Sequence, residues 1–149
     1  MAHTVNAWLA GRTAAGRDPA VAARPAYHAY QILHVGYAIL PIVAGADKFF
    51  DRLVNWDMYL APQVTQMLGL SAHRFMQAVG VIEMVAGVLV ALMPRVGGWV
   101  VALWLWGIIA NLFLAGGFYD IALRDFGLSL GALALARLAV DFGPRRFRL

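Results

Sequence analysis

The chain has 149 residues, of which 62% are hydrophobic and 13% are charged, and its formal net charge is +4. Soluble domains carry about 25% charged residues, so this composition excludes an ordinary water-soluble globule and predicts an all-α integral membrane protein. The absence of cysteine from the sequence excludes disulfides, thiol redox chemistry and Cys-ligated clusters. The positive charge predicts contact with anionic lipid headgroups rather than nucleic acid, because the sequence contains no nucleic-acid-recognition motif.

Four apolar segments follow one another along the chain, each close to the roughly 20 residues that a membrane-crossing helix needs. They cover about residues 27–50, 74–93, 96–118 and 121–140. We therefore expect a single domain built as a four-helix bundle, preceded by a lead of residues 1–26 and followed by a basic tail of residues 141–149. Residues 4–15 of the lead are expected to form a short helix on the membrane surface or to be irregular.

The connections between these segments differ greatly in length. Residues 94–98 form a turn so short that the second and third spans must be antiparallel neighbours. The one long loop, residues 47–72, is rich in aromatic and aliphatic side chains, which predicts one or two short helices at the outer membrane surface. Ser71 is a suitable N-cap for the second span.

Lys and Arg residues are distributed unequally between the two ends of the predicted bundle. Eight of the twelve lie on the side of the two termini and of the 94–98 turn, and four lie on the other side. By the positive-inside rule, this excess predicts that both termini are cytoplasmic.

Glu83 lies alone within the apolar run of residues 75–94. A carboxylate at mid-depth in a bilayer costs about 2.5–3.5 kcal/mol on insertion scales, and such residues are functional-site candidates by default. We expect Glu83 to face protein rather than lipid. It is either part of a ligand or proton site, or a neutral acid that only hydrogen-bonds between helices.

Three further polar residues fall near the depth of Glu83. At 1.5 Å per residue, Asn111 and Tyr37 lie within about 3 Å of its level, and His34 lies slightly deeper. A hydrogen bond between Glu83 and Asn111 across neighbouring antiparallel helices is expected, with Tyr37 or His34 closing the group. These residues form the inner part of a candidate site.

A second polar layer lies nearer the outer surface and includes Lys48, Arg124 and Asp125. It is interpreted either as a solvated rim or as a vestibule above Glu83, in which Lys48 or Arg124 would hold an anionic or carbonyl-bearing ligand. The candidate cluster therefore joins residues of both layers. Its members are Glu83, Asn111, His34, Tyr37, Lys48, Arg124 and Asp125.

Small residues indicate where helices approach one another in a membrane. Gly80 and Gly87 lie seven residues apart on the second span, Gly107 lies on the third, and Gly127 and Gly131 form a G-x-x-x-G step on the fourth. Together they favour a compact bundle.

Neither a metal centre nor haem is expected from the histidines. His28 and His34 are six residues apart, which places them on different faces of one helix, and no His/carboxylate pair has the spacing of a helical metal site. Quinone is the one cofactor that the cluster suggests.

Three sequence elements resemble the DoxX-like family of small four-helix bacterial membrane proteins. They are Gly45-Ala46-Asp47-Lys48-Phe49-Phe50, Gly80-Val81-Ile82-Glu83 with Gly87, and Leu123-Arg124-Asp125 with Gly131, and the resemblance covers about residues 30–140. Some members are subunits of thiosulfate:quinone oxidoreductase. The resemblance implies a bacterial inner-membrane location and points to Lys48, Glu83, Arg124 and Asp125 as the matching polar positions.

These observations predict an accessory or anchor subunit of a quinone-linked redox assembly. Glu83 would accept a proton, Lys48 and Arg124 would donate hydrogen bonds to the quinone carbonyls, and no catalytic residue or autonomous activity is expected. The partners would be the bilayer, a redox protein and a second copy of the chain. Two alternatives stay open: a small proton-coupled carrier or channel, and a structural scaffold without a ligand.

Overall fold

The computed structural model describes residues 19–144, and within that range every regular element is a helix. The elements are α2 (Pro19–Asp47), η1 (Trp56–Tyr59), α3 (Pro62–Leu68), α4 (Ala72–Leu92), α5 (Pro94–Ala115) and α6 (Tyr119–Phe142). The all-α prediction is confirmed for this part of the chain. The surface helix expected at residues 4–15, and residues 145–149 of the basic tail, lie outside the described residues.

Local sequence explains where the helices begin and end. Ser71 caps α4 as predicted, because its hydroxyl accepts a hydrogen bond from the backbone N–H of Arg74. Met93 alone separates α4 from α5, since Pro94 cannot donate the hydrogen bond that would continue α4 but suits the first turn of the next helix. The long loop contains two short helices, η1 and α3, where one or two were expected. By contrast, α2 begins at Pro19, well before the apolar run.

Three of the long helices are long and apolar enough to cross a membrane: Arg24–Asp47, Ala72–Leu92 and Pro94–Ala115. Their outward surface is hydrophobic, as shown by Ile32 and Leu103, whose exposed fractions are 73% and 69%. An apolar surface of this extent suits lipid better than water. The fourth long helix, α6, includes Arg124, Asp125 and Arg137 and does not meet the same criterion.

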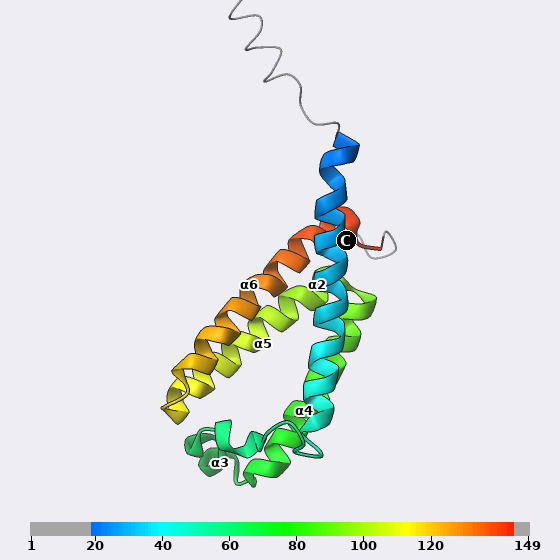
Figure 1. Ribbon diagram of the computed structural model, residues 1–149. Coiled ribbons are helices and arrows are strands. Elements are labelled where there is room, and N and C mark those ends of the chain that lie inside the picture. Colours follow the sequence, from blue (N-terminus) through cyan, green and yellow to red (C-terminus); the bar gives the residue numbers. More distant parts are fainter. Residues whose placement is uncertain (1–18, 145–149) are drawn as a thin grey trace, which may run out of the picture.

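The long helices pack as two antiparallel pairs, α2 with α4 and α5 with α6 (Figure 1). The pairs converge near the α4–α5 turn and diverge toward the opposite end. There the segment 49–71, which carries η1 and α3 and which we call the cap, lies across the wide end. Because η1 contacts both α4 and α5, the cap bridges the two pairs.

Two hydrophobic clusters hold this arrangement together. The larger one lies between the pairs where they converge and includes Tyr30, Val90 and Leu135. The smaller one, built on Ile109, Leu112 and Ala122, packs against Tyr59 of the cap and Phe118.

Candidate functional site

The central feature of the site is a buried ion pair between Lys48 and Glu83. The Lys48 ammonium lies 2.5 Å from Oε2 of Glu83, and the exposed fractions of the two side chains are 2% and 9%. Glu83 faces protein, as the sequence predicted, and its partner comes from the second polar layer. The lysine is unusual for its position. A lysine at a helix end normally extends toward the headgroups, whereas this one points into the protein.

Two glycines explain why the pair forms. A Cβ atom on Gly80 of α4 would lie 2.5 Å from the carbonyl oxygen of Gly45 on α2, and the reciprocal approach is equally close. Only glycine permits backbones to come this near. Lys48 and Glu83 each follow one of these glycines by three residues, about one helical turn, and the notional Cβ of Gly80 lies 3.2 Å from Cβ of Lys48. The close contact therefore lays the lysine stem along α4.

The remaining surroundings of the ammonium come from α2 and from the cap. The Lys48 nitrogen lies 3.5 Å from the carbonyl oxygen of Ala44 and 3.7 Å from the ring centre of Trp56. Such a cation over an indole face is favourable, most of all where water is excluded. Trp56, which belongs to the cap, thus covers the Lys48 ammonium on that side of the site.

Asp47 fixes the position of Trp56. Its Oδ2 accepts a 2.8 Å hydrogen bond from the indole N–H of Trp56. The same carboxylate accepts backbone hydrogen bonds from Arg52 and Leu53, which shape the turn after α2. Asp47 is therefore a positioning residue that stabilises the cap above Lys48.

A second carboxylate, Asp125 of α6, lies within electrostatic range of both Lys48 and Glu83. Its side chain is 7% exposed, and its ion-pair partner is Arg124, whose Nε lies 3.3 Å away but whose side chain is 65% exposed. Two buried carboxylates, one on each helix pair, thus lie within electrostatic range of a single buried ammonium. Arg124 lies at the rim rather than inside.

Trp104 of α5 completes the group. Its indole nitrogen is buried and close to the Glu83 carboxylate, but among the described residues it makes no hydrogen bond of ordinary geometry. The site therefore offers an indole N–H, an ammonium and two carboxylates within a largely apolar setting.

The predicted hydrogen bond between Glu83 and Asn111 is wrong. The Asn111 side chain instead accepts a 3.0 Å hydrogen bond from the backbone N–H of Ala61 and donates a 2.7 Å bond to the carbonyl of Tyr59. Asn111 faces the cap, which offers two backbone groups that match a side-chain amide. Asn111 therefore holds the cap against α5.

His34 also lies apart from Glu83, which corrects the second prediction. Its Nε2 lies 3.0 Å from the carbonyl oxygen of Val90 and 3.2 Å from that of Ala91. In an unbroken helix, the Val90 carbonyl would accept from the residue four positions later, which is Pro94 and has no N–H. His34 of α2 supplies the missing donor and fastens the α4–α5 turn to α2.

We expect replacement of His34 by phenylalanine to destabilise the protein by about 1–3 kcal/mol, because a carbonyl in a part-buried position loses its donor. Phenylalanine keeps a ring next to Tyr30, whose centre lies 5.3 Å from that of His34, so the change isolates the hydrogen bond. Thermal unfolding in detergent measures the loss, and His34→Gln, which retains a donor, should recover part of it. Equal stability of His34→Phe and the native protein would show that the bond is dispensable.

Tyr37 links α2 to α6 rather than to Glu83. Its hydroxyl donates a 2.5 Å hydrogen bond to the carbonyl of Leu128 and lies against Gly131, where a Cβ atom would overlap it. Gly131 thus marks a helix contact, as predicted. Gly107 and Gly127 have open space where a Cβ would lie, so these two do not mediate contacts within the chain.

Sequence reasoning found Lys48, Glu83 and Asp125 but missed how Trp56 closes the site. The aromatic loop was visible in the sequence, yet nothing in its spacing shows which ring lies over the lysine. The Gly45–Gly80 contact could have been predicted from the sequence, because each glycine precedes a charged residue by three positions.

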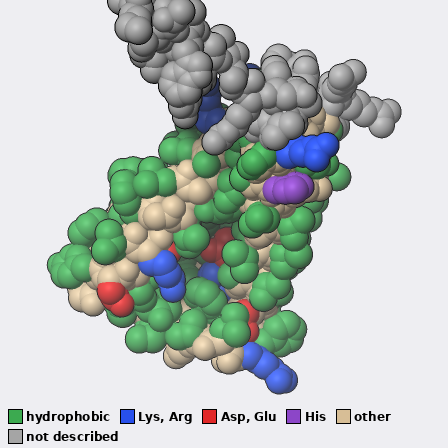
Figure 2. Space-filling model, turned by 45° about the horizontal axis from the view of Figure 1, so that its top comes forward, with side chains coloured by type: hydrophobic (Ala, Val, Ile, Leu, Met, Phe, Trp, Pro, Cys, Tyr) green, Lys and Arg blue, Asp and Glu red, His purple; other side chains and the backbone are tan. Residues whose placement is uncertain are grey.

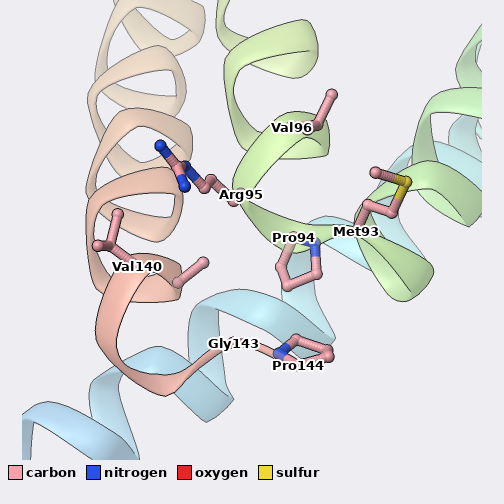
Figure 3. A pocket seen from close by; sticks show the side chains of 8 residues that line it. Met93, Pro94, Arg95, Val96, Val140, Gly143 and Pro144 are labelled. Carbon is pink, nitrogen blue, oxygen red and sulfur yellow. The ribbon is translucent and has the colours of Figure 1, made fainter. Parts of the chain in front are cut away.

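One face of the protein has a hollow in which charged side chains are visible. Figure 2 shows acidic and basic side chains at the bottom of a hollow in the middle of one face, surrounded mostly by hydrophobic side chains. A separate small cavity of about 20 Å³ lies at the other end, where Pro94, Arg95 and Val140 approach Pro144 (Figure 3). It has room for about one water molecule, so it is no site for an organic cofactor. The described residues include no group of three His, Cys, Asp or Glu side chains that could hold a metal ion.

Comparisons of the chain with protein-family models, with curated proteins and with solved structures find no match. The geometry of the Lys48–Glu83 site is therefore the basis on which a function can be proposed.

Proposed function

We propose that this protein is a DoxX-like subunit of a quinone-linked redox assembly in the bacterial inner membrane. In this proposal α2, α4, α5 and α6 all span the bilayer as a four-helix bundle, and both termini are cytoplasmic. The subunit anchors or assists a redox partner and holds a quinone headgroup, with no turnover of its own.

The buried Lys48–Glu83 pair carries this proposal. Burying two charges is expensive, and such a pair is weak evidence for stability because apolar residues would often serve better. Ionisable groups inside a membrane protein are functional candidates by default. An ammonium suits a carbonyl acceptor, and a carboxylate suits the proton that a quinone takes up when it is reduced. Asp125 and Arg124 add a second acid and a rim cation to the same group.

Quinone retained by the purified protein tests the proposal. Protein extracted in mild detergent from quinone-containing membranes is expected to carry quinone, detected after solvent extraction. Glu83→Gln is expected to lose it, and the matched control Asp120→Asn, which changes an exposed carboxylate on α6, is expected to keep it.

A second variant tests whether a loss of quinone is caused by misfolding. Lys48→Met/Glu83→Gln removes both charges, leaves no unpaired one, and is expected to remain helical by circular dichroism while failing to bind quinone. Absence of quinone from the native protein, or its full retention in this double variant, would refute the proposal.

One observation favours the carrier alternative: the two carboxylates within electrostatic range of Lys48 belong to different helix pairs, which is an arrangement that could pass a proton between them. Proton flux into liposomes that is abolished by Glu83→Gln, together with no bound quinone, would support that alternative. Absence of both activities, with a stable partner recovered, would support the scaffold.

A further inference from the structure

We infer that an open groove beside the end of α2 binds one anionic phospholipid, with the lipid phosphate on Arg52 and an acyl chain against α2. The groove has a volume of about 360 Å³ and is lined by residues 42–47 of α2 and residues 50–53 of the turn that follows. Neither Lys48 nor Glu83 lines it, so the lipid would bind in addition to the proposed quinone.

The lining of the groove is mostly apolar and exposed. Ile42 and Val43 contribute to it from α2, and Phe50 and Leu53 contribute from the turn. The exposed fractions of Phe50 and Leu53 are 71% and 68%, which is unfavourable for such side chains in water. The volume is within the roughly 300–1,000 Å³ of sites that bind small organic molecules. The groove therefore suits an apolar chain.

The position of the groove favours a lipid as the source of that chain. The segment Arg24–Asp47 is long and apolar enough to cross a membrane, and the groove lies at its end. The end of a membrane-crossing helix is where acyl chains meet phosphate headgroups. A molecule bound here would have its apolar part along α2 and its polar part beside the turn.

Asp47 gives the turn a fixed shape. Its carboxylate accepts backbone hydrogen bonds from Arg52, at 3.1 Å, and from Leu53, at 3.0 Å. It also accepts the 2.8 Å bond from the indole N–H of Trp56. The groove is therefore formed by the folded chain itself, and the oxygens of its one acidic lining residue already have partners.

Arg52 is the one basic residue among those that line the groove. Its side chain is exposed and has no acidic partner among residues 19–144. A guanidinium can donate two parallel hydrogen bonds to a phosphate. An unpaired arginine beside an apolar groove is thus complementary to a molecule with a phosphate and an apolar chain. This charge complementarity favours an anionic phospholipid over a second copy of the protein, which would leave the arginine unpaired.

Native mass spectrometry of the delipidated protein in detergent tests the assignment. The protein is titrated with phosphatidylglycerol, which is anionic, or with phosphatidylcholine, which is zwitterionic, with acyl chains of equal length. One phosphatidylglycerol per chain is expected to bind about fivefold more tightly than phosphatidylcholine, the usual contribution of one arginine near anionic lipid.

Arg52→Gln is expected to remove this preference by weakening phosphatidylglycerol binding about fivefold. Arg74→Gln is the matched control, because Arg74 is an exposed cation at the start of α4 that does not line the groove. Val43→Trp fills the groove and is expected to weaken both lipids. Its control is Val35→Trp, at an exposed position of α2 outside the groove.

Several results would overturn the inference. Equal losses in Arg52→Gln and Arg74→Gln would show general surface attraction, and unchanged binding in Val43→Trp would show that no acyl chain occupies the groove. Glycerophosphoglycerol, the headgroup without chains, binding as tightly as phosphatidylglycerol would indicate a soluble anion. A native dimer that Val43→Trp dissociates without loss of lipid would place a second copy in the groove.

Circular dichroism checks that each variant stays helical. Arg52 and Val43 are both exposed, so neither change disturbs a buried contact, and if Val43→Trp unfolds, Arg52→Gln decides alone. No quinone is present in the titration, so its outcome and that of the quinone-retention experiment are independent.

Discussion

Replacement of Lys48 by methionine is expected to lower the free energy of unfolding by about 3–5 kcal/mol, the usual cost of removing one partner from a buried ion pair. The loss has this size because the Glu83 carboxylate, 9% exposed and 2.5 Å from the ammonium, would be left unpaired in an apolar environment. The contact between the cation and the Trp56 ring would disappear with it. Reversible unfolding in mixed detergent micelles provides the measurement.

A double-mutant cycle separates the ion pair from the packing of its side chains. Lys48→Met, Glu83→Gln and their combination are compared with the native protein, and the combination is expected to be more stable than the sum of the single losses predicts. Arg124→Gln is the matched control, because its ion pair with Asp125 lies at the rim and exposed pairs contribute little. Additive losses in the cycle would show that Lys48 and Glu83 do not stabilise each other.

The second large effect is expected from Gly80→Ala. The new Cβ would lie 2.5 Å from the carbonyl oxygen of Gly45, and a backbone atom cannot turn aside as a side chain does. Helices α2 and α4 must then separate, at a cost of about 1–3 kcal/mol for overpacking. Separation also pulls Lys48 away from Glu83, so the variant is expected to lose any quinone that the native protein retains.

Gly127→Ala makes the same chemical change as Gly80→Ala but is expected to have the opposite effect on stability. Apart from the neighbouring residues and backbone of its own helix, no atom lies within 4 Å of a Cβ at that position, and alanine in a helix is favoured over glycine by roughly 0.5–1 kcal/mol. This variant is therefore expected to be as stable as the native protein or slightly more stable. If Gly80→Ala and Gly127→Ala had equal effects, the close approach of α2 and α4 would be refuted.

Much of the fold follows from simple properties of the sequence. Hydropathy located the four long helices to within a few residues, except at the start of α2, where alanine-rich sequence continues the helix to Pro19. The Met93–Pro94 break and the Ser71 cap were also predictable, because each depends only on neighbouring residues. Whether α6 crosses a membrane stays a prediction.

The candidate site was predicted less completely, and His34 and Asn111 show why. Arguments from depth assume that polar side chains in a membrane pair with one another. Here backbone groups compete successfully: His34 serves a carbonyl that Pro94 cannot satisfy, and Asn111 serves two backbone groups of the cap. An unpaired backbone N–H or carbonyl in an irregular segment needs a hydrogen-bond partner as much as a polar side chain does. Its position, however, is known only once the chain has folded.

Lys48 was assigned to a separate layer for a related reason. Its α-carbon lies just beyond the end of α2, which suggests an orientation toward the aqueous phase. The side chain turns back instead, because the Gly45–Gly80 approach lets the lysine stem pack against α4, one helical turn before Glu83. The position of Lys48 in the sequence therefore predicts the level of its α-carbon along the helix axis, but not the direction in which its side chain points.

The inward lysine has a consequence for biosynthesis. Its acidic counterpart lies 35 positions later in the chain, so when the ribosome has delivered α2 the ammonium has no counterion and can remain among phosphates at the bilayer surface. Only after the next hydrophobic stretch arrives can the charge move inward and be neutralised. In the proposed four-helix bundle, the α2–α4 hairpin, rather than either helix alone, is therefore the smallest unit expected to enter lipid with this charge neutralised.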